Sequence, residues 1–160
     1  MALALKNGAP WLAPYRPLAE QVLHAANAAS VVVALNAARG DTSASPRFVD
    51  HRELPAGEPY ESFIARTACI PTRENLHDLL NGLVWLTYPQ TKRWLNVLQA
   101  REIASRGATG PRGPLRDALT VFDENAVALQ APASVIDALV RHDCPGVVRR
   151  ERGRGSNPRR

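Results

Sequence analysis

The fold of this chain is decided by residues 72–94, which read TRENLHDLLNGLVWLTYPQTKRW. Five apolar side chains in this stretch recur at spacings of three and four residues: Leu76, Leu79, Leu80, Leu83 and Val84. That spacing is typical of one face of an amphipathic helix. The sequence therefore predicts a central helix from Thr72 to Leu86, with Thr72 as its N-terminal cap.

Two further residues indicate that neighbouring segments cover this helix on two sides. Trp85 falls on the side opposite the apolar face, at about 100° of rotation per residue. Gly82 lowers helix propensity by roughly 1 kcal/mol relative to Ala, which is explained if another backbone passes close by. We therefore expect the helix in the middle of the molecule, with the imidazole of His77 turned inward.

Helices are also predicted on both sides of the central one. Prolines near the first turn, serine caps and terminal glycines mark their ends. The predicted spans are about 17–27, 31–38, 60–67, 89–105 and 131–142. In the helix that follows Pro89, four apolar residues are expected to face the core: Trp94, Leu95, Leu98 and Ile103.

A small antiparallel hairpin is predicted further along the chain. Residues 118–122 (ALTVF) and 126–130 (AVALQ) flank Asp123-Glu124-Asn125, whose side chains favour a turn because they bond back to the local backbone. Phe48-Val49 is expected to form a short strand or an anchoring contact. The predicted fold is mainly α (α+β): a single helical domain with one small antiparallel β-hairpin.

The charge of the chain is concentrated in its last residues. Residues 149–160 hold six Arg and one Glu, which leaves 14 basic and 14 acidic residues in the predicted domain over 1–148. The domain opens with a proline-rich N-terminal arm over 1–17, and the Arg/Gly-rich tail is expected to be disordered. Nucleic-acid binding by the folded body is therefore not expected, although the tail arginines can contact phosphates nonspecifically.

Cysteine usage and hydropathy indicate the compartment. Cys69 and Cys144 form no CxxC motif, and two thiols do not make a disulfide scaffold, so a reducing cytoplasm fits best. The most apolar region, residues 25–38, is broken by polar side chains and is too short for a membrane span. The chain is expected to be a soluble cytoplasmic protein without a membrane partner.

The sharpest candidate for chemistry is the pair His77-Asp78. Adjacent residues of a helix point about 100° apart, so the two side chains are not expected to hydrogen-bond to each other. An imidazole and a carboxylate suit a divalent metal ion of the zinc, manganese or iron type, the one cofactor that the sequence implies. The favoured alternative is structural: His77 and Asn81 bridge the helix to a neighbour, and Asp78 stabilises the helix N-terminus.

Other polar residues extend this candidate pocket. Lys92 and Asn96 form a polar edge at i, i+4 that could face it, and the predicted hairpin would bring further groups: Arg116, Asp117 and Asp123. Asp123, together with Glu124 and Asn125, also suits a turn, which is the favoured interpretation. A helical phosphohydrolase of the HD type is disfavoured, because its additional histidine, His51, would lie in a loop.

Three motifs together resemble one bacterial family. They read Leu54-Pro55-x-Gly57-x-x-Tyr60-Glu61-x-Phe63-Ile64, then Asn75-Leu76-His77-Asp78, Asn81-x-x-Val84-Trp85 and Tyr88-Pro89-x-x-Lys92-x-x-Leu95-Asn96, then Gly113-Pro114-Leu115-Arg116-Asp117-x-Leu119-Thr120-x-Phe122-Asp123-Glu124. From about Trp11 to about His142 the chain is similar to the family catalogued as domain of unknown function 3025. The resemblance implies a soluble protein of proteobacterial type and carries no activity. The chain departs from the family where Ala126 replaces a turn glycine, and its tail is consistent with a truncated or frameshifted end.

Two functions remain open at this point, and whether the chain is an enzyme stays undecided. The favoured one is a non-catalytic binding or scaffold domain organised around the His77-Asp78 helix. The alternative is a hydrolase-like pocket that binds a metal or a polar ligand through His77, Asp78 and a downstream Asp. No partner is implied by the sequence.

Overall fold

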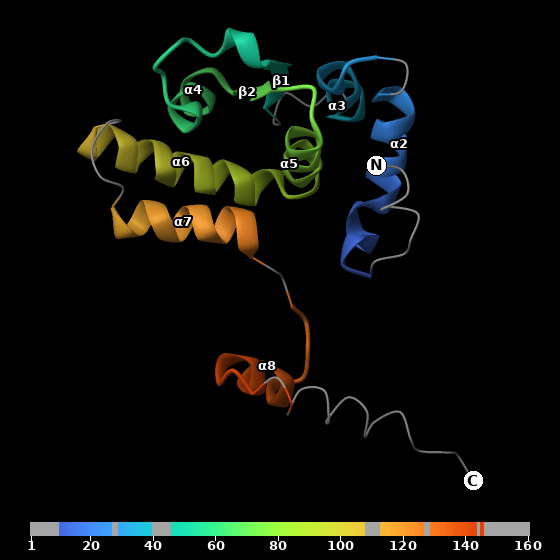
Figure 1. Cartoon of the computed structure of the whole chain (residues 1–160), viewed down its shortest axis with the longest axis vertical. Coiled ribbons are helices and arrows are strands. Elements are labelled where there is room, and N and C mark those ends of the chain that lie inside the picture. Colours follow the sequence, from blue (N-terminus) through green and yellow to red (C-terminus); the bar gives the residue numbers. More distant parts are fainter. Residues whose placement is uncertain are drawn as a thin grey trace. The chain divides into compact units, whose positions relative to one another are not determined.

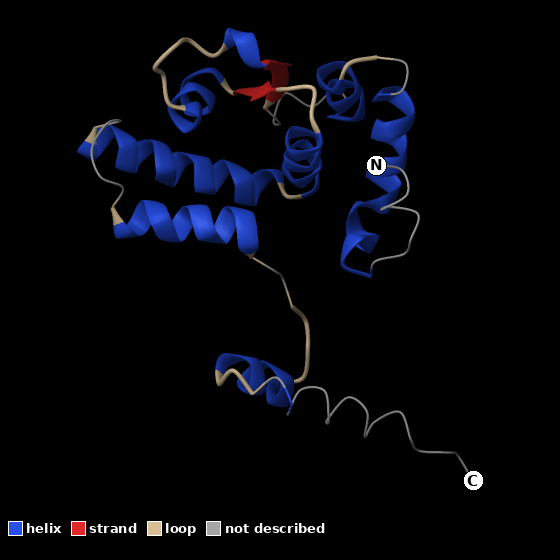
Figure 2. Cartoon of the chain, in the orientation of Figure 1, coloured by secondary structure: helices blue, strands red, loops and turns tan. Residues whose placement is uncertain are grey.

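The chain is mainly helical (Figures 1 and 2), as a computed structural model shows for residues 10–26, 29–39, 46–107, 113–126, 129–143 and 145. It divides into two compact units, Met1–Asn125 and Ala126–Arg160. The single domain predicted over residues 1–148 stays a prediction. Among the described residues, no helix is long and apolar enough to cross a membrane.

The first unit begins with a short 3-10 helix and two α-helices: η1 (Pro10–Tyr15), α2 (Arg16–Ala26) and α3 (Val31–Arg39). Helices α2 and α3 pack together through fully buried side chains, with Val22 on α2 and Leu35 on α3. The predicted cap of α3 is confirmed, since Ser30 Oγ accepts a hydrogen bond from the backbone N–H of Val33. Both predicted helices are confirmed to within two residues.

Two short strands form a parallel sheet, β1 (Arg47–Asp50) and β2 (Cys69–Thr72), with Phe48 paired to Ile70. Between them lie η2 (His51–Glu53) and α4 (Tyr60–Thr67), so the unit is a β-α-β crossover, as parallel pairing requires. The strand expected at Phe48-Val49 and the helix expected over 60–67 are confirmed. The amide of Asn36 on α3 donates to the carbonyl of Phe48 and accepts from its N–H, at 2.7 and 3.0 Å.

The predicted antiparallel hairpin is wrong. Residues 114–125 form one helix, α7 (Pro114–Asn125), so the supposed first strand and the turn Asp123-Glu124-Asn125 both lie within helical backbone. Alternating apolar residues suggested a strand, but Pro114 suits a first helical turn, and Leu119 is the buried residue of this helix. The β-structure lies upstream instead, at β1 and β2.

The central helix is confirmed as α5 (Leu76–Thr87), which contacts α3, η1 and α6 (Pro89–Arg106). It begins later than predicted, because the N-cap is Asn75 and not Thr72. The side-chain oxygen of Asn75 accepts from the N–H of Asp78 at 2.8 Å. Thr72 is buried in β2 instead, where its hydroxyl donates to the carbonyl of Ile70.

Gly82 lies where α5 packs against Leu35 of α3. A Cβ atom built there would lie 2.7 Å from Cδ2 of Leu35, which is itself fully buried. The close neighbour expected from the sequence is therefore a side chain and not a backbone. Leu79 and Leu83 of the predicted apolar face are buried in the same core.

The apolar face predicted for α6 is partly wrong. Trp94 is 65% exposed and Leu98 is 38% exposed, whereas Ile103 is buried as expected. The other buried positions of this helix are polar: Lys92, Asn96 and Gln99. Hydrophobicity alone misplaced this face, because the neighbouring helices α4 and α7 supply partners for polar side chains.

The second unit contains helix α8 (Ala133–Val140), with Val135 and Ala138 buried. The last predicted helix is thereby confirmed. Cys144 and the tail over 149–160 lie outside the described residues.

Candidate functional site

Asp78 lies in the first turn of α5, with its carboxylate turned back toward the end of β2. It accepts hydrogen bonds from the backbone N–H of Arg73 at 2.7 Å, from Nε of the same residue at 3.1 Å and from Nδ1 of His77 at 3.0 Å. Because an ionised carboxylate only accepts, Nδ1 of His77 carries the hydrogen. The expectation that the two side chains would not bond was therefore wrong, since side-chain torsions close the gap that the helix rotation opens.

His77 itself points into solvent. Its side chain is 79% exposed, which contradicts the expected inward orientation of the imidazole. The helix lies centrally in its unit, but His77 occupies its outward side.

The electrostatics of Asp78 follow from these contacts. Burial acts to raise the pKa of its carboxyl, but the hydrogen bonds from His77 and Arg73 outweigh burial and hold this pKa below its usual range. Asp78 is therefore ionised at neutral pH and is engaged by its own chain segment. The hydrogen bonds between Asp78 and Arg73 link the first turn of α5 to the residue that follows β2.

The predicted metal site gains no third ligand from the part of the chain that is described. No group of three His, Cys, Asp or Glu side chains that could hold a metal ion occurs there. Asp117 lies exposed in the first turn of α7, and Asp123 is paired with a lysine. Among the described residues, the predicted metal site therefore consists of two possible ligands, the imidazole of His77 and the carboxylate of Asp78.

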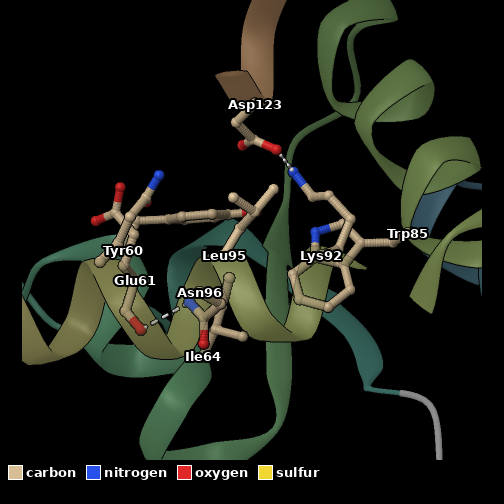
Figure 3. Close-up of a pocket in the computed structure, with 9 residues that line it drawn as sticks. Tyr60, Glu61, Ile64, Trp85, Lys92, Leu95, Asn96 and Asp123 are labelled. Atoms are coloured by element: carbon tan, nitrogen blue, oxygen red, sulfur yellow. Dashed lines mark hydrogen bonds and ion pairs between the residues drawn. The ribbon is translucent and has the colours of Figure 1, made fainter. Parts of the chain in front are cut away.

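A different group of residues surrounds a cavity of about 40 Å³ (Figure 3). It lies between α4, α5, α6 and the C-terminal end of α7. The residues that line it are Tyr60, Glu61, Ile64, Trp85, Lys92, Leu95, Asn96, Gln99 and Asp123. A buried water molecule needs roughly 10–15 Å³ on this measure, so the cavity accommodates about three water-sized groups.

Lys92 and Asp123 form an ion pair at the edge of this cavity. The ammonium group lies 2.6 Å from Oδ1 of Asp123, and the lysine side chain is only 8% exposed. It also lies 5.5 Å from the centroid of the Trp85 ring, within the range of a cation–π interaction. The pair joins α6 to the end of α7.

Trp85 brings a buried donor to the cavity. The residue is 4% exposed, and its indole N–H has no acceptor among the described residues. Figure 3 shows the indole nitrogen on the side of the ring that faces Lys92 and Leu95. A buried N–H without a partner costs about 1–3 kcal/mol, so the position of Trp85 in the cavity lining favours a bound acceptor.

Tyr60 and Asn96 complete the polar wall. Burial raises the pKa of the Tyr60 hydroxyl well above its ordinary value, so the group keeps its proton, and Nδ2 of Asn81 donates to it at 3.2 Å. Nδ2 of Asn96 donates to the backbone carbonyl of Glu61 at 2.9 Å. Since a carbonyl can only accept, this bond fixes the amide orientation and leaves Oδ1 of Asn96 as an acceptor.

The structure therefore separates the residues that the sequence grouped as one pocket. Three of them line the cavity: Lys92, Asn96 and Asp123. Asn81 reaches it through Tyr60, while His77 and Asp78 belong to the β2–α5 junction and Arg116 and Asp117 to the first turn of α7.

Sequence reasoning missed four polar or aromatic residues of the cavity: Tyr60, Glu61, Trp85 and Gln99. Signals were present for some of them. Tyr60 and Glu61 lie in the first family motif, and Trp85 stands opposite the apolar face of its helix while carrying an N–H group.

The fold and site define a mainly helical domain with a two-stranded parallel sheet and a small cavity lined by both polar and apolar groups. The chain belongs to the family described as "Protein of unknown function (DUF3025)", whose model matches residues 46–157. The match begins next to β1, includes every residue of the cavity, and starts and ends later than the resemblance seen in the sequence. No curated protein and no solved structure matches the chain.

Proposed function

We propose that this protein is a non-catalytic binding domain that takes a small polar ligand in the cavity between α4, α5 and α6. The observation that carries the proposal concerns Trp85, a residue of the cavity lining, whose buried indole N–H has no acceptor among the described residues. Binding sites typically combine apolar walls with a few placed polar groups, and Ile64 and Leu95 supply such walls here.

The helix that carries His77 and Asp78 organises this domain. Asp78 holds the β2–α5 junction through its bonds to Arg73, and further along the same helix Asn81 contacts Tyr60 and Trp85 reaches the cavity. We therefore assign a structural role to the His77-Asp78 pair. The free thiol of Cys69 supports a reducing, cytoplasmic setting for the domain.

One observation favours the alternative, a hydrolase-like site that uses a metal or a polar ligand. Asp78 orients the exposed imidazole of His77 through Nδ1, an arrangement that general bases use. If this alternative holds, Zn²⁺ or Mn²⁺ raises the melting temperature of the wild-type chain and leaves that of His77→Ala unchanged. The binding-domain proposal predicts no such metal-dependent difference.

A thermal-shift screen of small polar compounds on the whole chain tests the proposal. A compound at 100 times its Kd stabilises the folded state by about 2.7 kcal/mol, which raises the melting temperature by several degrees. The compounds that stabilise the wild type should lose most of this effect in Trp85→Phe, which removes the N–H and keeps an aromatic ring. Trp94→Phe, on the exposed side of α6, is the matched control and should respond like the wild type. Equal responses in both variants would refute the proposal.

A further inference from the structure

We infer that the cavity binds an uncharged carboxamide or urea-type group of a small molecule. This inference rests on the proposed binding function and names the chemistry of the ligand. It follows from the size of the cavity, from its hydrogen-bonding groups and from its charge.

The size of the cavity sets the size of the bound group. Its volume of about 40 Å³ corresponds to about three water-sized groups. A carboxamide has three non-hydrogen atoms, carbon, oxygen and nitrogen. A larger molecule would therefore place such a group in the cavity and keep the rest of its atoms outside.

The donors of the cavity require an acceptor oxygen on the ligand. The indole N–H of Trp85 has no partner among the described residues, and an ammonium such as that of Lys92 carries three hydrogens, one of which faces Asp123. The hydroxyl of Tyr60 accepts from Asn81 and retains its own proton as a donor. A ligand that consists only of an ammonium or a guanidinium group lacks an acceptor for the Trp85 N–H.

The acceptors of the cavity require donors on the ligand as well. Oδ1 of Asn96 is left as an acceptor by the bond from Nδ2 to Glu61, and Oδ2 of Asp123 remains beside the ion pair. The buried amide of Gln99 adds one more acceptor oxygen. The NH₂ of a carboxamide supplies two donors for such groups, next to its acceptor oxygen.

The charges that line the cavity exclude an anionic group. Among the described residues that line it, Lys92 is the one cation, and Asp123 neutralises it at 2.6 Å. An anion would therefore lose its hydration in the cavity without gaining an unpaired positive charge, which is unfavourable. An uncharged group avoids this cost.

The indole N–H signals of the ¹⁵N-labelled chain provide the test, with three probes of matched size: acetamide, acetate and ethylammonium. The signal of Trp85 is assigned by its disappearance in Trp85→Phe or, if that variant does not fold, by elimination after Trp11→Phe and Trp94→Phe. The Trp94 signal serves as an internal control because this side chain is 65% exposed. We expect acetamide to shift the Trp85 signal saturably and to leave the Trp94 signal in place.

The comparison between the three probes shows which chemical group the cavity binds. Acetate should bind roughly tenfold more weakly than acetamide or worse, which corresponds to about 1.4 kcal/mol of binding free energy, and ethylammonium should not shift the Trp85 signal. Gln99→Ala, which removes an acceptor oxygen and an NH₂ group with two donors from the wall, should weaken acetamide binding.

Three outcomes overturn the inference. If acetate binds as tightly as acetamide, the ligand is a carboxylate, and the binding function stands while its assigned chemistry fails. If acetamide has no effect but other compounds from the thermal-shift screen move the Trp85 signal, the carboxamide assignment again fails alone. If no compound moves this signal and none stabilises the chain through Trp85, both the inference and the proposed function fail.

Discussion

At the scale of single residues, Asp78 and His77 differ sharply although they are neighbours in the sequence and share a hydrogen bond. The carboxylate of Asp78 is buried and accepts from backbone and side-chain donors, whereas the ring of His77 is exposed. The loss of a hydrogen-bonded charge at a buried site costs more than the loss of an exposed partner.

The first prediction therefore compares two alanine variants. Asp78→Ala should lower the free energy of unfolding by about 1–3 kcal/mol, because the N–H of Arg73 loses its acceptor. His77→Ala should lower it by about 1 kcal/mol or less. Urea denaturation of both variants measures these changes. A larger effect of the histidine variant would contradict the structural account of the pair.

The lowered pKa of Asp78 predicts a pH dependence. A carboxyl whose pKa is lower in the folded than in the unfolded state contributes stability above the unfolded value, which is about 3.9 for Asp. This contribution is lost as the pH falls through the lowered folded pKa. The stability difference between the wild type and Asp78→Asn should therefore shrink from pH 5 downward. A difference that is constant from about pH 6 to about pH 2 would rule out this linkage.

At the scale of elements, the contact between α3 and α5 depends on Gly82. A Cβ there meets the methyl groups of Leu35, whose side chain is fully buried and has little room to move. Overpacking costs about 1–3 kcal/mol, and the gain in helix propensity from Gly to Ala offsets roughly 1 kcal/mol of it.

Gly82→Ala should therefore lower the melting temperature, although alanine favours a helix. In a Leu35→Ala background the added methyl group enters the vacated space, so the same substitution should be neutral or stabilising there. A double-mutant cycle of melting temperatures measures this coupling. Additive effects of the two substitutions would show that the helices do not touch at this point.

The contact between α6 and α7 depends on the pair Lys92 and Asp123. Asp123→Asn should lower the free energy of unfolding by about 1–3 kcal/mol, because it leaves a mostly buried ammonium without its counter-charge. Asp117→Asn, at an exposed position of the same helix, is the matched control and should change stability by about 1 kcal/mol or less. Equal effects would show that the pair contributes nothing specific.

Local sequence signals predicted the helices well and the strands only in part. The spans of α3 and α4 and the C-terminal end of α5 follow from caps, prolines and apolar spacing, which are properties of neighbouring residues. The hairpin prediction failed because a short alternating run cannot be distinguished from part of a helix by periodicity alone. Strand β2 was missed because its four residues, CIPT, contain a proline and depend on the distant partner β1.

At the scale of the whole molecule, the predominance of helix could be predicted, and the cavity could not. Its lining comes from four helices between Tyr60 and Asp123, and its polar groups lie on faces of α5 and α6 that hydrophobic patterning does not assign to the interior. Lys92 and Asn96 were identified by their i, i+4 spacing. Asp123 was included in the candidate pocket because of a predicted hairpin that does not form. Its position beside Lys92 results instead from the packing of α7 against α6.

The most direct test of the account is a crystal structure of the chain grown with acetamide. We predict electron density for the probe in the cavity, with its oxygen about 3 Å from Nε1 of Trp85 and its nitrogen within hydrogen-bonding reach of Oδ1 of Asn96. Density only for water in the cavity, or an indole N–H that donates to a protein acceptor, would contradict the account.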